Sequence, residues 1–312
     1  MGVWNSHTSV GNIAGSVLAA AVLEFGWGWS FLVPAFVIAA LGVVVLVFLV
    51  AHPSDAGLDL DAMMKVEMNG DGGEEVELLV EDKKVDDDDE LELEMGSQLP
   101  TAIGFLEAWR LPGVAPYAFC LFFSKLVAYT FLYWLPFYIR NNAGQFLSHK
   151  ASGILSIVFD IGGVLGGISA GFLSDAIGAR AITSALFLLL SIPALILYRT
   201  FGSISMGHNI TLMFISGYFV NGPYSLITTA VATDLGTQDA IKGNSRALAT
   251  VSAIIDGTGS VGAALGPLLT GYISTRGWNS VFFMLIVSIS LALVFLIRIA
   301  RDEIVAKIGA RR

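Results

Sequence analysis

The chain has 312 residues, of which 55% are hydrophobic and 14% are charged, and its formal net charge is −9. Charged residues make up about a quarter of a typical soluble globular protein, so the composition excludes that class and predicts an integral membrane protein. Lipid forces backbone amides to pair within the chain, and the apolar runs are too long for barrel strands of about 10 residues. The expected fold class is an all-α, multi-pass membrane bundle.

Eight apolar runs are long enough to cross a membrane, since a spanning helix needs about 20 residues. In chain order, the predicted spans are residues 3–23, 29–51, 114–139, 151–174, 180–200, 209–233, 247–273 and 278–299. Two spans therefore precede a long polar segment, and six follow it. The predicted parts are a two-helix unit at 1–52, a linker at 53–111, a six-helix bundle at 112–302 and a basic tail at 303–312.

The acidity of the chain is concentrated in the predicted linker. Between Asp55 and Glu94 there are 17 acidic residues and three lysines, so this stretch carries −14 and the rest of the chain +5. The linker is poor in aromatic residues and too polar to form a core, which predicts disorder. Its aspartate run lacks the ligand spacing and turn glycine of an EF-hand, so a solvated linker is favoured over a calcium site.

Basic residues indicate how the predicted spans are oriented. Alternating eight spans places the linker, the 175–180 turn, the 234–246 segment and the C-terminus on one side, with twelve Lys and Arg residues against four on the other. Because cytosolic loops carry the excess of Lys and Arg, we expect the first side to be cytosolic. The membrane is expected to be the plasma membrane or an organelle membrane such as that of the endoplasmic reticulum.

The turn sequence GFLSDAIGAR contains Gly171, Asp175, Gly178 and Arg180 between two closely spaced spans. This pattern resembles the cytosolic loop signature of the major facilitator superfamily, in which the glycines allow close helix approach and the charges tie helix ends together. Three further stretches, at residues 4–12, 125–139 and 222–236, resemble the organophosphate:phosphate antiporter branch, which includes sugar-phosphate exchangers and glycerol-3-phosphate transporters.

The resemblance implies a numbering for the spans. The family shows its loop signature after its second and eighth spans, so the eight spans here correspond to family spans five to twelve. Residues 2–12 then look like the interior start of span five. We therefore expect the chain to be a truncated isoform or an incomplete gene product that lacks the first four helices of the family.

Lys125 is the main candidate for substrate binding. A charged group well inside a span costs about 2.5 to 3.5 kcal/mol on insertion scales, so it is expected to face a cavity or a partner. Tyr129, four residues on, shares its helix face. An ammonium group beside a phenol suits a phosphate dianion, whereas a lysine snorkelling to the interface is the structural alternative. In the bacterial glycerol-3-phosphate antiporter the corresponding arginine aligns with Ala128, so lysine is a departure from the pattern.

His7, Asn221 and Tyr224 complete the predicted site, and two aspartates lie in spans of the same bundle. His7 lies one residue before Thr8, the position that matches the family's functional histidine; cavity lining and helix pairing are equally open for it. Asn221 and Tyr224 follow Tyr218 at successive i+3 steps, a ribbon that fits either substrate hydroxyls or helix packing. Asp160 and Asp256 would repel an anion, so each is expected to be protonated or paired with a basic group.

Other chemistry is not expected. The glycines of GTGSVG, residues 257–262, follow no strand, and with Gly266 they favour close helix packing over dinucleotide binding. The four histidines have no metal-ligand spacing, and no serine or cysteine has an evident base nearby. We therefore expect a protein that is not an enzyme, with no catalytic residues, no metal and no cofactor.

The predicted function is secondary active transport. The chain is expected to exchange an organic phosphate, such as glycerol 3-phosphate or a sugar phosphate, for inorganic phosphate by alternating access. The expected partners are these anions and the lipid bilayer, not nucleic acid. Two alternatives stay open: a truncated, non-transporting partner of a full-length carrier, and a major facilitator carrier for a different small solute.

Overall fold

A computed structural model describes residues 2–50, 103–142, 147–228, 235 and 245–310. The described residues form α-helices and short 3-10 turns, with no strand among them. The helices are α1 (Gly2–Val22), α2 (Trp29–Phe48), α5 (Phe105–Arg110), α6 (Val114–Asn142), α7 (His149–Ile177), α8 (Arg180–Phe201), α9 (Met206–Leu226), α11 (Ser245–Ile273) and α12 (Trp278–Ala310), with 3-10 turns η1 (Leu23–Phe25) and η4 (Ser274–Arg276).

The helices confirm the all-α membrane class and correspond in order to the predicted spans. Seven of them are long and apolar enough to cross a membrane. The remaining predicted span, 209–233, coincides with α9, and residues 229–233 of it lie outside the described part of the chain. The predicted linker lies mostly outside the described residues, so its expected disorder stays a prediction.

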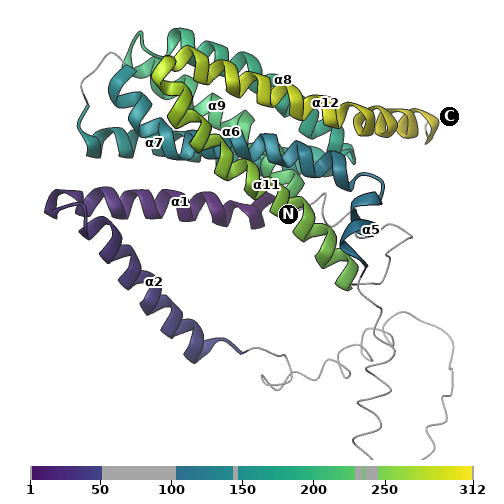
Figure 1. Cartoon of the computed structure of the whole chain (residues 1–312), viewed down its shortest axis with the longest axis horizontal. Helices are drawn as coiled ribbons and strands as arrows, with labels where there is room; N and C mark the ends of the chain where they lie inside the picture. Colours follow the sequence, from purple (N-terminus) through teal and green to yellow (C-terminus); the bar gives the residue numbers. More distant parts are fainter. Residues whose placement is uncertain (1, 51–102, 143–146, 229–234, 236–244, 311–312) are drawn as a thin grey trace, which may run out of the picture. The chain divides into compact units, whose positions relative to one another are not determined.

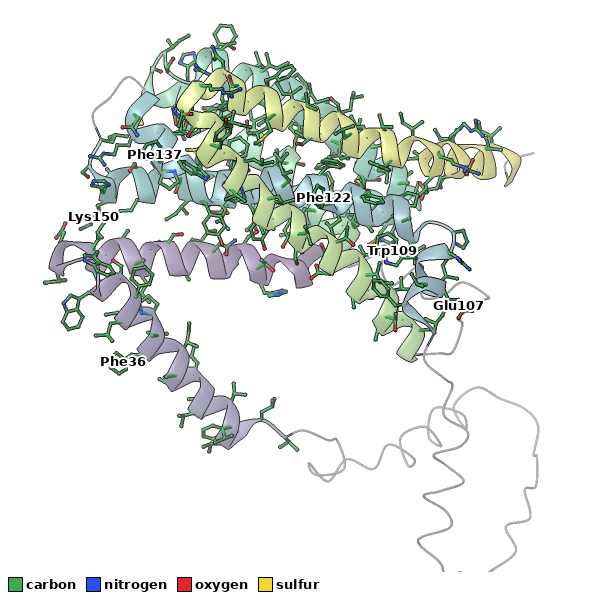
Figure 2. All side chains as sticks on the ribbon, in the orientation of Figure 1. Phe36, Glu107, Trp109, Phe122, Phe137 and Lys150 are labelled. Atoms are coloured by element: carbon green, nitrogen blue, oxygen red, sulfur yellow. The ribbon has the colours of Figure 1, made fainter. Side chains whose placement is uncertain are left out.

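Two compact units divide the chain. One consists of residues 1–30 and 100–312, and the other of residues 31–99. The described part of the second unit is most of α2, an apolar helix with an internal proline, Pro34, and no buried residue. Most of its side chains, including the labelled Phe36, are accordingly exposed (Figure 2).

Glycine contacts set the two closest helix pairs of the first unit, α6 with α11 and α7 with α9 (Figure 1). A Cβ atom added to Gly262 of α11 would lie 2.0 Å from the carbonyl oxygen of Phe122 in α6, and one at Gly266 would lie 2.4 Å from that of Leu126. At Gly166 of α7 the corresponding distance to the Tyr218 oxygen of α9 is 1.9 Å. These separations admit no side chain, so Gly262 and Gly266 of α11 serve close helix packing, as the sequence predicts.

The last helix is longer than the sequence predicts. We expected the span to end at residue 299, but α12 continues to Ala310. Its extension contacts the start of α8: both carboxylate oxygens of Glu303 accept hydrogen bonds from the backbone amides of Ala181 and Ile182, at 3.0 and 3.1 Å. Lys307 donates to the Ile177 carbonyl at the end of α7. These contacts satisfy helix-terminal groups and explain why the helix persists beyond the apolar run.

Candidate functional site

Lys125 lies inside the bundle on α6, with 5% of its surface exposed. Its Nζ donates to Oδ1 of Asp256 on α11 at 2.6 Å. The two ends of this ion pair differ in environment, because the lysine side chain is 6% exposed and that of the aspartate 52%. Glycine brings the helices close here, since a Cβ on Gly259 would lie 2.9 Å from the Lys125 Cδ. Lys125 therefore does not snorkel: its charge is held within the protein by a carboxylate that is itself half-exposed.

Two tyrosines flank this ion pair. The Nζ of Lys125 lies 5.7 Å from the ring centroid of Tyr224 on α9, within the range of a cation–π interaction. Electrostatic interactions also link the Tyr224 hydroxyl to the Tyr129 hydroxyl and to the Asp256 carboxylate. Three helices thus bring one cation, one anion and two phenol groups together.

Asn221 is placed one helical turn before Tyr224 and packs tightly against α7. Its side chain is 9% exposed, and its Nδ2 donates to the carbonyl of Gly217 at 3.3 Å. A Cβ on Gly163 of α7 would lie 2.4 Å from that nitrogen. A small polar cleft lined by Ser9, Asn221 and Tyr224 adjoins these residues. The three residues of the predicted polar ribbon do not share one environment: Asn221 and Tyr224 line the cleft, whereas the Tyr218 ring stacks on Phe187 of α8.

Neighbouring positions on α1 have different contacts. His7 is exposed, and its Nε2 lies 3.4 Å from the hydroxyl oxygen of Thr8. Thr8 of this helix interacts with the Tyr224 hydroxyl. The structure therefore brings the position that matches the family's histidine to the site, and His7 lies next to it.

The ion pair also shows what sequence reasoning missed. For Asp256, either protonation or pairing with a basic group was expected; it is paired, and its partner, Lys125, lies 131 residues away in the chain. Asp160, for which protonation or pairing was also expected, has no hydrogen-bond or ion-pair partner among the described residues. Residue spacing within one helix gives no information about contacts with a distant helix. The sequence therefore could not show that Lys125 and Asp256 pair.

The four loop-signature residues lie together at one end of the bundle. Gly178 ends α7 with a φ of 62°, a left-handed conformation that favours glycine. Nη1 of Arg180 lies 3.0 Å from Oδ1 of Asp175, and Gly171 is buried within α7. Across the described ranges, no three His, Cys, Asp or Glu side chains are grouped to hold a metal ion.

This combination of packed glycines, a loop signature and a cation inside a span is typical of membrane carriers. The sequence profile of the Major Facilitator Superfamily matches residues 1–240 and 147–312. The chain belongs to the Major Facilitator Superfamily. The predicted family is thereby confirmed, and the helices fit the multi-pass fold of that superfamily.

Relatives place this superfamily member in the expected branch. The chain is 68% identical to "Putative glycerol-3-phosphate transporter 5" of Arabidopsis thaliana over 97% of its own length and 62% of the relative. It is 54% identical to "Putative glycerol-3-phosphate transporter 1" of the same plant, over 100% and 59% respectively. It is 47% identical to "Glucose-6-phosphate exchanger SLC37A2" of Xenopus laevis, over 100% and 63%. The chain thus spans about three fifths of the length of these relatives.

Proposed function

We propose that this chain acts in secondary active transport, exchanging an organic phosphate for inorganic phosphate by alternating access. The observation that carries the proposal is the Lys125 ammonium group, which is buried inside the bundle yet paired with a half-exposed carboxylate. The names of the relatives support the ligand class, since they refer to glycerol 3-phosphate and glucose 6-phosphate.

The ion pair suggests how an anion would bind. A phosphate group approaching from the exposed side of Asp256 would take over the contact with Lys125, because a dianion offers more negative charge than one carboxylate. The Tyr129 and Tyr224 hydroxyl groups would donate to the remaining phosphate oxygens. Because the ammonium group is buried, each charge-assisted contact with it is stronger than it would be in bulk solvent.

Exchange follows from the use of one site for both ligands. Inorganic phosphate and a phosphate ester share the group that Lys125 would bind, so either would satisfy the cation during reorientation. In inverted-repeat carriers such a site lies near the midplane and is exposed alternately to the two sides. The gradient of one anion then drives movement of the other, and no nucleotide hydrolysis is required.

Uptake into proteoliposomes tests the proposal. Vesicles loaded with inorganic phosphate should accumulate labelled glycerol 3-phosphate or glucose 6-phosphate, and vesicles without internal phosphate should not. Lys125→Ala should abolish uptake. Arg276→Ala is a matched control, because Arg276 also lies over a tyrosine, 5.4 Å from the Tyr272 ring centroid, but is exposed. Equal uptake without internal phosphate, or normal exchange by Lys125→Ala, would contradict the proposal, and no uptake at all would favour the non-transporting partner.

A further inference from the structure

A second polar region lies along the same helices as Lys125 but outside the predicted site. A cavity of about 290 Å³ is bounded by α1, α6 and α7 and by Ser30 at the start of α2. Its polar lining consists of Ser16, Ser30, His149, Ser156 and Asp160. The apolar lining includes Phe131 and Phe159, whose rings stack with centroids 4.8 Å apart.

The polar groups of this cavity are mainly hydrogen-bond acceptors. The hydroxyl of Ser30 donates to the carbonyl of Ala19 at 3.0 Å, and that of Ser156 donates to the carbonyl of Gly153 at 2.7 Å. The protons of Ser30 and Ser156 are therefore used, and their oxygen lone pairs are left to accept. Asp160 adds a carboxyl group with no hydrogen-bond or ion-pair partner in the described part of the chain.

The hydrogen-bond acceptors that line this cavity favour a ligand that donates hydrogen bonds. A phosphate group in this cavity would meet the Asp160 carboxylate and serine lone pairs, and would be repelled. A hydroxyl group would instead donate to them, and a hydrogen bond to a charged acceptor is stronger than one between neutral groups. The stacked phenylalanines offer an apolar surface for the carbon atoms of the same molecule. The cavity thus suits a polyhydroxylated group rather than an anion.

Helical spacing relates this cavity to Lys125. Leu132 of α6 lines the cavity and lies seven residues after Lys125. Asp160 of α7 lies seven residues before Gly167, which lines the cleft beside Tyr224. Seven residues make almost two turns, so each pair shares a helix face at an axial separation of roughly 10 Å. One elongated molecule with an anionic end and a hydroxylated end fits this separation.

We propose that the cavity around Asp160 binds the hydroxyl groups of an organic phosphate whose phosphate contacts Lys125. This inference rests on the proposed function and deepens it, because it names Asp160 as a residue that determines specificity. Inorganic phosphate has no hydroxylated carbon chain to reach the cavity, so Asp160 distinguishes the two exchanged ligands. A sugar phosphate reaches farther along the bundle than glycerol 3-phosphate and depends on Asp160 more strongly.

Competition binding tests the inference. Labelled inorganic phosphate is bound to the purified chain and displaced by glucose 6-phosphate, glycerol 3-phosphate, methyl phosphate or unlabelled phosphate. Asp160→Ala should weaken displacement by glucose 6-phosphate at least about tenfold, since a charged hydrogen bond is lost. The loss for glycerol 3-phosphate should be smaller, and methyl phosphate and inorganic phosphate should change less than about twofold. Asp160→Asn, which keeps one acceptor oxygen, should be intermediate.

Several outcomes would overturn the inference. An equal loss for all four ligands would show a general effect on folding or charge, and unchanged displacement by glucose 6-phosphate would exclude contact. Sodium-dependent binding that disappears in Asp160→Ala would assign the cavity to a cation instead. Absence of phosphate binding by the unmodified chain would be a failure of the proposed function, which this design separates from a failure at Asp160.

A labelling experiment gives a second readout that does not depend on substituting Asp160. Ser16→Cys places a thiol in the cavity lining, and the native Cys120 is buried. Glucose 6-phosphate should slow modification of this thiol by a small polar reagent, whereas inorganic phosphate should not. Equal protection by both ligands, or by neither, would contradict occupation of the cavity by a sugar.

Discussion

At the residue scale, the Asp256 carboxylate contacts Lys125 at the position where the phosphate group of a ligand is proposed to bind. The carboxylate offsets the cost of a buried ammonium group while the site is empty. It also competes with a ligand, because a phosphate must replace it at a contact of 2.6 Å. The affinity for phosphate is then set by the difference between two ion pairs, which keeps binding reversible, as a carrier needs.

Asp256→Asn tests this competition. We expect the variant to bind inorganic phosphate about fivefold more tightly, because a partly exposed ion pair is worth roughly 1 kcal/mol and the amide competes poorly for Lys125. Equilibrium binding of labelled phosphate in detergent measures the change. Asp302→Asn removes an exposed carboxylate that lies 3.8 Å from Arg301 and should leave affinity unchanged. Weaker binding by Asp256→Asn would show that the carboxylate supports the ligand instead.

At the element scale, glycines determine which helices can approach each other. Four glycines of α7 face α9, and contacts with backbone or small polar atoms replace side chains there. The same arrangement joins α11 to α6, where Gly259 also makes room for the Lys125 stem. Close packing of α11 against α6 is what brings Asp256 within hydrogen-bond distance of Lys125. Helix packing and the candidate site are therefore coupled.

Two alanine substitutions on α11 should have opposite effects on stability. Gly262→Ala places a Cβ 2.0 Å from the Phe122 oxygen, so the helices must separate, at a cost of about 1 to 3 kcal/mol. A Cβ added at Gly257 would have no neighbouring atom within 4 Å, so Gly257→Ala should stabilise the helix by up to about 1 kcal/mol. Thermal unfolding in detergent measures both. A tolerated Gly262→Ala would show that the α6–α11 contact is looser than described.

The extension of α12 makes a further connection between elements. Glu303 accepts from two amides at the start of α8, and Lys307 donates to the end of α7. Favourable charges thus meet both helix ends, a carboxylate at an N-terminus and an ammonium at a C-terminus. The helix ends that carry Asp175 and Arg180 are thereby contacted by a third helix, which the sequence of the turn alone did not indicate.

At the scale of the whole molecule, the number of spans determines which ends share a side. Six predicted spans separate the acidic linker from the C-terminus, so both should face the same compartment, and the excess of Lys and Arg predicts that this compartment is the cytosol. The acidic residues do not reverse this assignment, because the rule depends on basic residues rather than on net charge.

Epitope accessibility checks this orientation. A tag fused after Arg312 should bind antibody only in permeabilised cells if the chain is in the plasma membrane. A tag inserted in the turn at residues 202–205, between α8 and α9, should be accessible in intact cells and serves as the matched control. The reverse pattern would contradict the proposed orientation.

Helix positions were largely predictable because their cause is local. An apolar run in lipid must pair its own amides, so composition alone placed α6 and α8 within a few residues of their observed bounds. The end of α12 was not predictable in this way. Its last three turns mix charged and apolar residues beyond the continuous apolar run, and Glu303 and Lys307 find partners on other helices there.

In the candidate site, too, the features with a local cause were predictable from the sequence and the contacts between helices were not. Lys125 stood out in the sequence because a charge inside an apolar run is costly, and this cost is independent of which partner relieves it. Its pairing with Asp256, the contact of Thr8 with Tyr224 and the cavity around Asp160 all required the packing of separate helices. The cost of placing a charge inside an apolar span depends on that residue and its span alone, whereas a contact depends on how distant segments are arranged. The sequence by itself therefore determined the membrane class, the family and the cation, and the tertiary structure decided what surrounds that cation.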